Sequence, residues 1–406
     1  MWIGQGIAIL GAGVSEAALK VAIVVGEVSG DLLGADLIAA LKRQFPGDVD
    51  LRGVGGEGLE AQGLCSLFDF SELQVMGITQ VLSKLPRLVR RIGETASAII
   101  AAKPDVLIIV DSPDFTHRVA KRVRTALPDL PVVNYVCPSV WAWKEYRAQR
   151  MLAYVDHVLA VLPFEPEVMH RLGGPPTTYV GHRLTADQNL LYARGQRAQT
   201  KPRGPADRKT VMLLPGSRSS EITKLLPHFG DAVHELVARN GEMRFILPTM
   251  PRRESMIRDL VKDWTTKPEI VTGAEAKWRA FTEADAAMAA SGTVVLELAL
   301  TGVPCISAYK TDWIIKLMTS KIKTWSAALP NLIADYAVVP EYINDVVRGG
   351  SFARWMEKLS VDTLPRQAMM EGYDVLWQRM QTEKPPGEHA AEIVLDILQK
   401  KKPGQK

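Results

Sequence analysis

The sequence predicts an α/β protein of two doubly wound domains, each a parallel sheet covered by helices on both faces. Three observations support this fold class. Short apolar runs alternate with segments of helical periodicity. The alternation stops in a polar, basic stretch and then starts again. At 406 residues, the chain is too long for one hydrophobic core and suits two domains of ordinary size.

The first half contains five apolar runs that we expect to be strands. They are continuous rather than alternating with polar residues, which is typical of a parallel sheet that is buried on both faces. The expected strands are Val21–Val25, Val49–Gly53, Val106–Val110, Val132–Val136 and Val155–Val161. The expected helices are Leu32–Gln44, Thr79–Ala102, Phe115–Leu127 and Glu165–Leu172.

A polar stretch near the middle of the chain predicts an exposed linker, because it is basic and rich in Gly and Pro. The alternation resumes after it, and the chain from Glu341 on is expected to be helical only. The expected strands of the second half are Val211–Leu214, Arg244–Pro248, Glu269–Val271, Ala286–Ala289 and Pro304–Ala308. The chain then divides into a leader (1–19), a first domain (20–185), the linker (186–209), a second domain (210–345) and C-terminal helices (346–406).

The composition excludes several functional classes. The net charge is only +4 and both signs are spread widely, so no nucleic-acid partner is expected. The histidines form no H-x-x-H pattern and the cysteines lie far apart, so no metal site is expected. No apolar run is long enough for a membrane-spanning helix. Near the start, Gly11-x-Gly13 is followed by Glu16 where a dinucleotide fingerprint needs glycine, so no dinucleotide cofactor is expected.

Two turns of the first half carry acids. Ligands of open parallel sheets bind at the carboxyl ends of the strands, so the turns that follow strands are the places for chemistry. The first strand leads into Gly26-Glu27-Val28-Ser29-Gly30-Asp31, with acids where a nucleotide phosphate would lie. Asp111 directly follows another strand, where a carboxylate that faces a cleft is a good general base. We therefore expect Asp111 to be catalytic and Asp114 to cap the next helix.

Two turns of the second half predict a phosphate site. In Pro215-Gly216-Ser217-Arg218, the glycine lets the backbone approach a ligand, the serine can donate a hydrogen bond, and the arginine offers a planar fork. Ser291-Gly292-Thr293 opens a helix whose free N–H groups and dipole favour an anion, and Glu297 follows one turn later, where it could bind ribose hydroxyls. Either turn alone could equally be a helix cap. Two such turns in one domain favour a diphosphate.

The loop NYVCPSVWAWKEYR carries Trp141 and Trp143 on either side of one alanine. The two rings could fill the core or form a wall against a sugar or lipid, and the sequence leaves both interpretations open. His182, in YVGHRL, is expected to be structural.

The segment QVMGITQVLSKLPRLVRRIGE predicts an amphipathic helix in which cations flank an apolar stripe. Such a helix can rest on an anionic bilayer, or its stripe can pack on the sheet. The sequence does not decide between them. The residues expected to contact a membrane are Val75, Met76, Ile78, Leu82, Leu85, Arg87, Arg90 and Arg91.

Taken together, these stretches resemble the lipid-A-disaccharide synthases. The motifs that carry the resemblance are GEVSGDLLGADLIAALK, LQVMGITQVL, KPDVLIIVDSPDF, YVCPSVWAWKEYR, VLPFEPEV, YVGHRL, LLPGSRSSEI, ASGTVVLELAL, GVPCISAY and LPNLIA. They occur in the family's order and span about Lys20 to Asp335.

The resemblance implies a GT-B fold, in which two Rossmann-like domains face a cleft and C-terminal helices cross back to the first domain. It implies UDP-2,3-diacylglucosamine as donor and 2,3-diacylglucosamine 1-phosphate (lipid X) as acceptor, with inversion, a β(1→6) bond and release of UDP. No metal or other cofactor is implied. The expected location is the cytoplasm, peripheral on the inner face of the inner membrane. A homodimer is left open.

The resemblance also assigns roles to individual residues. Asp111 matches the essential aspartate, and Arg218 the arginine at the nucleotide diphosphate. Glu297 matches the glutamate placed for the ribose, and Asn331 an asparagine of the donor site. The turn with Glu27 and Ser29 is expected to face the acceptor and the donor sugar.

Two alternatives remain at this stage. One is another GT-B UDP-sugar enzyme, such as a UDP-N-acetylglucosamine epimerase or a hexosaminyltransferase. The other is a protein that binds a nucleotide sugar or carries a lipid without catalysis.

Overall fold

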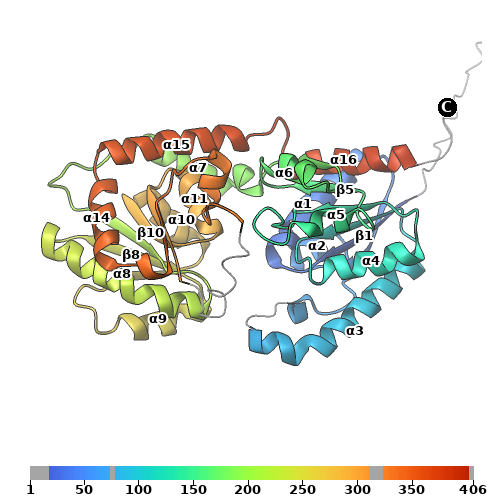
Figure 1. Cartoon of the computed structure of the whole chain (residues 1–406), viewed down its shortest axis with the longest axis horizontal. Coiled ribbons are helices and arrows are strands. Elements are labelled where there is room, and N and C mark those ends of the chain that lie inside the picture. Colours follow the sequence, from blue (N-terminus) through green and yellow to red (C-terminus); the bar gives the residue numbers. More distant parts are fainter. Residues whose placement is uncertain (1–17, 74–77, 311–322, 402–406) are drawn as a thin grey trace, which may run out of the picture. The chain divides into compact units, whose positions relative to one another are not determined.

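The computed structural model describes residues 18–73, 78–310 and 323–401, without the side chains of 78–85. The chain forms two compact units, whose elements are labelled in Figure 1. The first unit contains the chain up to Pro138, Met151–Leu159 and the chain from Pro386 on. The second contains Ser139–Arg150 and Ala160–Pro385. Most of the predicted leader lies outside the described residues.

The first sheet is parallel and has the strand order β2-β1-β3-β4-β5-β6. Its strands are β1 (Leu19–Val25), β2 (Val49–Val54), β3 (Val106–Val110), β4 (Val132–Tyr135), β5 (His157–Ala160) and β6 (Thr177–Tyr179). All of β3 and β4 is buried, which confirms that the continuous apolar runs are interior strands. The order reverses between β1 and β3, where Val25 pairs with Val110. The turns after these two strands therefore lie side by side.

Helices connect the strands of the first sheet. They are α1 (Val28–Gln44), α2 (Glu57–Ala61), α3 (Ile78–Ala102), α4 (Thr116–Ala126), α5 (Tyr146–Met151) and α6 (Glu165–Arg171). Short 3₁₀ turns lie at Phe70–Leu73 and Arg183–Ala186. The bounds of α3, α4 and α6 agree with the predicted helices to within one or two residues. The sequence did not predict α2 or β6.

The second sheet is also parallel, with the order β12-β11-β10-β7-β8-β9. Its strands are β7 (Thr210–Leu214), β8 (Arg244–Thr249), β9 (Glu269–Thr272), β10 (Ala286–Ala290), β11 (Cys305–Tyr309) and β12 (Glu341–Ile343). The order reverses between β7 and β10, and the two predicted phosphate turns follow these strands. β12 is a strand in the part of the chain that was expected to be only helical.

The helices that accompany the second sheet fall before, between and after its strands. They are α7 (Gln188–Ala198), α8 (Ser219–Asn240), α9 (Glu254–Val261), α10 (Ala274–Glu283), α11 (Thr293–Thr301), α13 (Leu329–Ala334), α14 (Gly349–Leu359) and α15 (Leu364–Met380). Short 3₁₀ turns lie at Pro251–Arg253 and Asn344–Val346.

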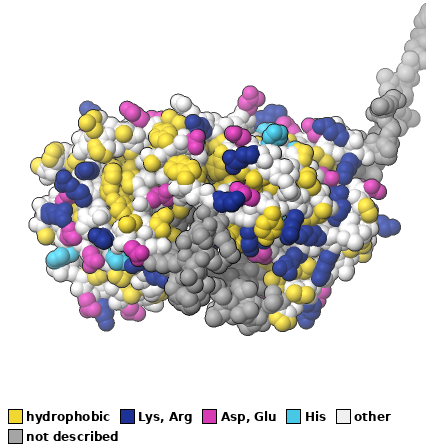
Figure 2. Space-filling model, in the orientation of Figure 1, with side chains coloured by type: hydrophobic (Ala, Val, Ile, Leu, Met, Phe, Trp, Pro, Cys, Tyr) yellow, Lys and Arg dark blue, Asp and Glu magenta, His cyan; other side chains and the backbone are white. Residues whose placement is uncertain are grey.

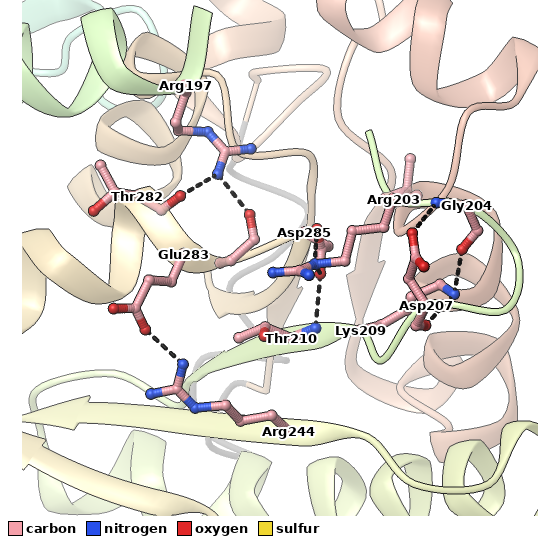
Figure 3. A network of polar contacts seen from close by, with 12 residues as sticks. Arg197, Arg203, Gly204, Asp207, Lys209, Thr210, Arg244, Thr282, Glu283 and Asp285 are labelled. Atoms are coloured by element: carbon pink, nitrogen blue, oxygen red, sulfur yellow. Dashed lines mark hydrogen bonds and ion pairs between the residues drawn. The ribbon is translucent and has the colours of Figure 1, made fainter. Parts of the chain in front are cut away.

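The stretch predicted to be an exposed linker is instead built into the second unit. Much of it forms α7, which packs on α10 and α11. The guanidinium of Arg197 donates to the carbonyl oxygens of Phe281 at 3.1 Å and Gly302 at 3.0 Å, and it also reaches the end of α10 (Figure 3). Most residues of this stretch are exposed, as predicted, but α7 and its bonded arginine make it part of the second unit and not a free linker.

The rest of the predicted linker is anchored at the amino end of the second sheet. Arg203 bonds both oxygens of Asp285, at 2.9 and 3.2 Å, and Asp285 accepts the backbone N–H of Thr210 at 2.7 Å (Figure 3). The amine of Lys209 donates to the carbonyl oxygens of Gly204 and Pro205, each at 2.6 Å. These bonds fix the start of β7.

The C-terminal helices do not all pack where the prediction put them. α14 packs on α8, and α15 packs on α13, so both belong to the second unit. Only α16 (Pro386–Lys401) packs on the first unit, against α1. A Cβ at Gly387 would lie 2.8 Å from the carbonyl oxygen of Asp36, so the glycine allows this close contact. The return of the chain to the first unit is thus made by one helix.

Candidate active site

Asp111 lies at the point where the strand order of the first sheet reverses. Ligands of doubly wound sheets bind at such points. Its backbone N–H donates to the carbonyl of Tyr135 at 3.0 Å, and its own carbonyl accepts the hydroxyl of Thr116 at 2.6 Å. The turn after β1 lies against Ser112, because a Cβ at Gly26 would lie 2.2 Å from the Cβ of Ser112. Only glycine fits there.

The backbone around Asp111 is held in an unusual conformation. Asp111 and Ser112 have φ values of 52° and 45°, and Val136 in the neighbouring β4 turn has 74°. Residues other than glycine rarely adopt positive φ, and a β-branched residue such as valine does so least. Backbone of this kind occurs preferentially at functional sites.

The Asp111 carboxylate is half-buried, and burial raises its pKa above the usual value for aspartate. The N–H of Ser112 donates to Oδ1 at 2.7 Å and opposes part of this rise. A general base is most efficient when its pKa lies near the working pH. A raised pKa therefore makes a carboxylate a better general base at neutral pH. Asp114 does not occupy the predicted cap position, since the N-cap residue of α4 is Phe115.

The acids of the first turn have different roles. Glu27 and Ser29 are exposed at the start of α1, where they could meet a ligand. Asp31 is buried, and its carboxylate accepts the N–H groups of Gly56 at 2.7 Å and Gly58 at 2.8 Å. Asp31 therefore anchors the start of α2 and is not placed for chemistry.

A buried polar network that the sequence did not reveal supports the β4 turn. The hydroxyl of Tyr154 lies 3.0 Å from Nδ1 of His117, and Nε2 of His117 lies 3.2 Å from Oδ1 of Asn134. The amide of Asn134 in turn donates to the carbonyl of Val136 at 3.0 Å. These bonds fit a neutral His117 that donates through Nε2. The network stabilises the strained turn beside Asp111.

The β7–α8 turn presents the predicted arginine, but an internal carboxylate already occupies the turn. Arg218 is exposed and forms an ion pair with Glu221 at 3.0 Å. The other oxygen of Glu221 accepts the N–H groups of Ser217 at 3.2 Å and Arg218 at 3.3 Å. This partner could not be identified from the sequence, because contact across a turn depends on side-chain conformation.

Among the described residues, the start of α11 shows no such internal cap. Gly292 is the N-cap residue and has no side chain to bond the free N–H groups, and a Cβ at Gly292 would have no neighbour within 4 Å. Thr293 is exposed, and the hydroxyl of Ser291 instead donates to the carbonyl of Ala327 at 3.1 Å. The cap interpretation of Ser291 and Thr293 is therefore wrong. The open N-terminus of α11 suits an anion.

Glu297 lies on α11, one turn from this N-terminus, and forms an ion pair with Lys277 of α10 at 2.7 Å. The Lys277 amine also lies 4.9 Å from the centre of the Trp278 ring. The pair keeps a charged carboxylate near the predicted nucleotide site. The sequence did not identify Lys277, since it lies in an ordinary polar helix.

Asn331 is too buried to contact the donor substrate directly. It is buried, and its amide oxygen accepts the N–H groups of Val338 at 2.9 Å and Val339 at 2.8 Å. Its amide nitrogen donates to the carbonyl of Val339 at 3.0 Å. The side chain is thus fully bonded within the second unit and shapes the approach to β12.

Trp141 packs against a buried carboxyl group. Its Nε1 donates to Glu165 at 3.3 Å, and its ring meets Phe164 edge to face. Trp143 instead stacks with the amine of Lys144, 4.2 Å from the ring centre.

His182 lies near the end of the first sheet. Nδ1 of His182 accepts the N–H of Leu184 at 3.1 Å, and burial lowers the pKa of His182 to about 4. His182 is therefore a neutral structural residue, as expected.

The predicted membrane segment is described only in part. Val75 and Met76 lie outside the described residues, and Ile78, Leu82 and Leu85 belong to α3 without described side chains. Arg87 and Arg90 are exposed and pair with Glu72 at 3.2 Å and Glu94 at 3.4 Å. Arg91 is less exposed and pairs with Glu72 at 2.7 Å. Further along α3, Ile92 is buried, so this end of the stripe packs on the protein.

The neighbouring helix α4 extends the basic surface. α4 packs against α3 and exposes Arg118, Lys121 and Arg122. Figure 2 shows Lys and Arg side chains gathered over this part of the first unit. No helix among the described residues is both long and apolar enough to cross a bilayer. Within the same described part of the chain, no cluster of His, Cys, Asp or Glu could hold a metal ion.

Solved structures share this two-sheet architecture. UDP-GlcNAc 2-epimerase from Neisseria meningitidis, solved with bound UDP-GlcNAc, matches with a TM-score of 0.57 at 14% identity, over 94% of this chain and 100% of the other. MurG from Acinetobacter baumannii matches with a TM-score of 0.55 at 15% identity, over 94% and 99%. These likenesses define the class of fold, GT-B.

Sequence comparison gives the family. The model of the lipid-A-disaccharide synthetase family matches residues 21–353. The lipid-A-disaccharide synthase of Nitrobacter winogradskyi is 45% identical over 93% of this chain and 96% of its own length. The enzyme of that name from Ruegeria pomeroyi is 38% identical over 94% and 96%. The chain belongs to the lipid-A-disaccharide synthase family.

The chain is therefore a glycosyltransferase that forms the lipid A disaccharide from a UDP-sugar donor and a lipid-X-type acceptor. This confirms the family resemblance and decides against the alternatives of an epimerase and a non-catalytic binding protein. The epimerases resemble the chain in fold alone, at 13–14% identity.

Proposed function

We propose that the general base of the reaction lies at the carboxyl edge of the first sheet, in the first unit. The nucleotide site lies at the carboxyl edge of the second sheet, in the second unit. The observation that carries this proposal is the position of the key turns. Asp111 and the Glu27 turn flank the point of strand reversal in the first sheet, and Arg218 and Thr293 flank it in the second.

Asp111 acts as general base. Its carboxylate takes the proton from the 6-hydroxyl of 2,3-diacylglucosamine 1-phosphate as that oxygen attacks the anomeric carbon of UDP-2,3-diacylglucosamine. The bond from this carbon to the UDP oxygen breaks with inversion, and UDP leaves with the bonding electrons. Glu27 and Ser29, exposed on the adjacent turn, bind polar groups of the sugars.

The second unit stabilises the charge that develops on UDP. The open N-terminus of α11 at Gly292 and Thr293 offers N–H groups to the diphosphate, and Ser217 and Arg218 add a second set of donors. Glu297 accepts hydrogen bonds from the ribose hydroxyls. Asn331 supports the site indirectly, through the chain that it bonds.

The enzyme meets its acylated substrates as a peripheral protein on the inner face of the inner membrane, from the cytoplasmic side. The exposed Arg87 and Arg90 of α3 and the basic face of α4 support this location, because cations near an amphipathic helix attract anionic lipids. A homodimer remains compatible with these roles.

Replacement of Arg218 tests the division of labour. Arg218→Met removes a donor to the diphosphate and should weaken UDP binding by about tenfold, the usual effect of one charge-assisted hydrogen bond. Isothermal titration with UDP measures this effect. Arg258→Met, which loses an exposed ion pair with Glu254 on α9, is the control. Unchanged affinity in the Arg218 variant would remove this residue from the nucleotide site.

A further inference from the structure

The β7–α8 turn holds an anion that belongs to the protein itself. Glu221, in the first turn of α8, directs its carboxylate back onto the turn. One oxygen accepts two backbone N–H groups, from Ser217 at 3.2 Å and Arg218 at 3.3 Å. The other oxygen lies 3.0 Å from Nη1 of Arg218. The carboxylate is thus bound by the same groups that would bind a phosphate.

Gly216 shows how closely the carboxylate fits. A Cβ at this position would lie 2.5 Å from Oε2 of Glu221 and 2.8 Å from its Cβ. Gly216 also has a φ of 105°, a conformation that side chains other than glycine rarely adopt. The glycine that suggested close approach of a ligand therefore makes room for Glu221. The Glu221 side chain is only 17% exposed, whereas that of Arg218 is 68% exposed.

A carboxylate and a phosphate cannot occupy this turn together. Both are anions, and two like charges within hydrogen-bonding distance of the same donors repel each other strongly. Backbone N–H groups at a helix N-terminus and a guanidinium fork are also the donors that phosphate groups prefer. A diphosphate that uses Ser217 and Arg218 must first displace the Glu221 carboxylate.

We propose that Glu221 is an internal competitor of the donor diphosphate, which lowers the affinity of the site for UDP and favours release of UDP after the transfer. This inference rests on the proposed nucleotide site in the second unit. When Glu221 swings away, the turn keeps a strong positive potential, because Arg253 also contacts it through a bond from Nε to the carbonyl of Ser217 at 3.3 Å. When UDP leaves, the carboxylate returns and satisfies the donors.

A purely structural role for Glu221 predicts the opposite effect. If Glu221 only caps α8 and holds Arg218 in place, its replacement disorders the arginine and weakens UDP binding. The sign of the change in UDP affinity therefore separates the two roles.

The test is Glu221→Gln, which keeps the size of the side chain and removes its charge. Isothermal titration measures the Kd of UDP, UMP and uridine with the full-length protein. The competitor role predicts that the Kd of UDP falls by about threefold to tenfold, as expected when a charged competitor for two or three hydrogen bonds is removed. The effect should be smaller for UMP and absent for uridine, which carries no phosphate.

Glu235→Gln is the matched control. Glu235 lies on the same helix and pairs with Arg239, so its replacement also removes one ion pair from α8. The Kd of UDP should not change in this variant. Glu221→Asp adds a second measurement in case the glutamine variant is unstable. Its shorter carboxylate reaches the turn less well, so the Kd of UDP should lie between those of the unaltered protein and Glu221→Gln.

The outcomes are distinguishable. A higher or unchanged Kd of UDP in both Glu221 variants, or an equal change for uridine and UDP, overturns the competitor role. If the unaltered protein binds uridine and UDP with equal affinity, the proposed diphosphate site itself is wrong. A lower Kd for UDP alone supports both.

Discussion

At the scale of single residues, Asp111 combines three features that bear on its proposed role. It follows a buried strand, it has a positive φ, and its carboxylate is half-buried with a raised pKa. The surrounding fold holds this conformation through bonds from Thr116 and to Tyr135. Such an arrangement costs free energy and persists where a function requires it.

The raised pKa of Asp111 predicts the pH dependence of turnover. A general base must be ionised, so activity is present above its pKa and is lost as the pH falls through it. We expect the acidic limb of kcat/KM to have its midpoint above 3.8, the usual value for aspartate. The pH dependence of kcat, measured over the same range, is free of titration of the unbound substrates. A midpoint at or below the usual value in both profiles would contradict a half-buried base.

A second prediction at this scale concerns Glu297. If its carboxylate accepts hydrogen bonds from the ribose, the protein should bind UDP more tightly than 2′-deoxy-UDP. Glu297→Gln should reduce this preference by about fivefold to tenfold, because a bond to a charged acceptor becomes a bond to a neutral one. Competition binding with the two nucleotides measures the ratio. Glu283→Gln, at the other end of α10 from the ribose site, should leave the ratio unchanged, and so would Glu297→Gln if the role is wrong.

At the scale of elements, α6 begins with a buried acid. Glu165 is 2% exposed and accepts the N–H groups of Val161 at 3.2 Å and Leu162 at 3.0 Å, as well as the indole of Trp141. Burial raises its pKa to about 8 and outweighs these donors. The carboxyl group therefore links the start of α6 to the tryptophan loop.

The stability of the protein should depend on the protonation of Glu165. Its pKa is higher in the folded than in the unfolded chain, so its contribution is fully present below the unfolded value of 4.5 and is lost as the pH rises through about 8. Relative to Glu165→Gln, the free energy of unfolding of the unaltered protein should fall by ~2–4 kcal/mol between about pH 5 and 8.

Urea unfolding at several pH values measures this difference. Glu167→Gln, which replaces an exposed carboxylate of the same helix, is the control variant. A constant difference between the unaltered protein and Glu165→Gln over this range would show that Glu165 does not titrate as its burial suggests.

The elements that the sequence predicted well are those whose burial follows from composition. Strands such as β3 and β10 are buried at every position, and a continuous apolar run is sufficient to locate them. The helix α7 was missed because Arg197 is bonded to carbonyl groups, and a polar side chain with such partners gives no apolar signal. Short elements such as β12 depend on tertiary pairing and have little signal of their own.

The candidate site follows the same pattern. The turns at Asp111, Arg218 and Thr293 were predictable, because turn residues after parallel strands mark the ligand edge. The roles of Asp31 and Asn331 were not, since both side chains bond backbone groups that are distant in sequence. The partners Lys277 and Glu221 appear only when helices and turns are placed in three dimensions.

At the scale of the whole molecule, two parallel sheets repeat one plan. Each sheet has six strands whose order reverses once, and in each the turns at the reversal carry the candidate residues. In the proposed mechanism, the first unit supplies a carboxylate, and the second supplies donors for an anion. The helix α16 returns from the second unit and packs on α1, so the first unit is completed only by the end of the chain.

The division of roles between the units is the central claim, and one variant tests it directly. Asp111→Asn keeps the shape of the side chain and removes the base. Turnover of UDP-2,3-diacylglucosamine and lipid X should fall by about 10²- to 10⁴-fold, the usual contribution of a general base. The Kd of UDP, which depends on the second unit, should stay within about twofold of the unaltered value. Normal turnover by this variant, or a large loss of UDP affinity, would contradict the account.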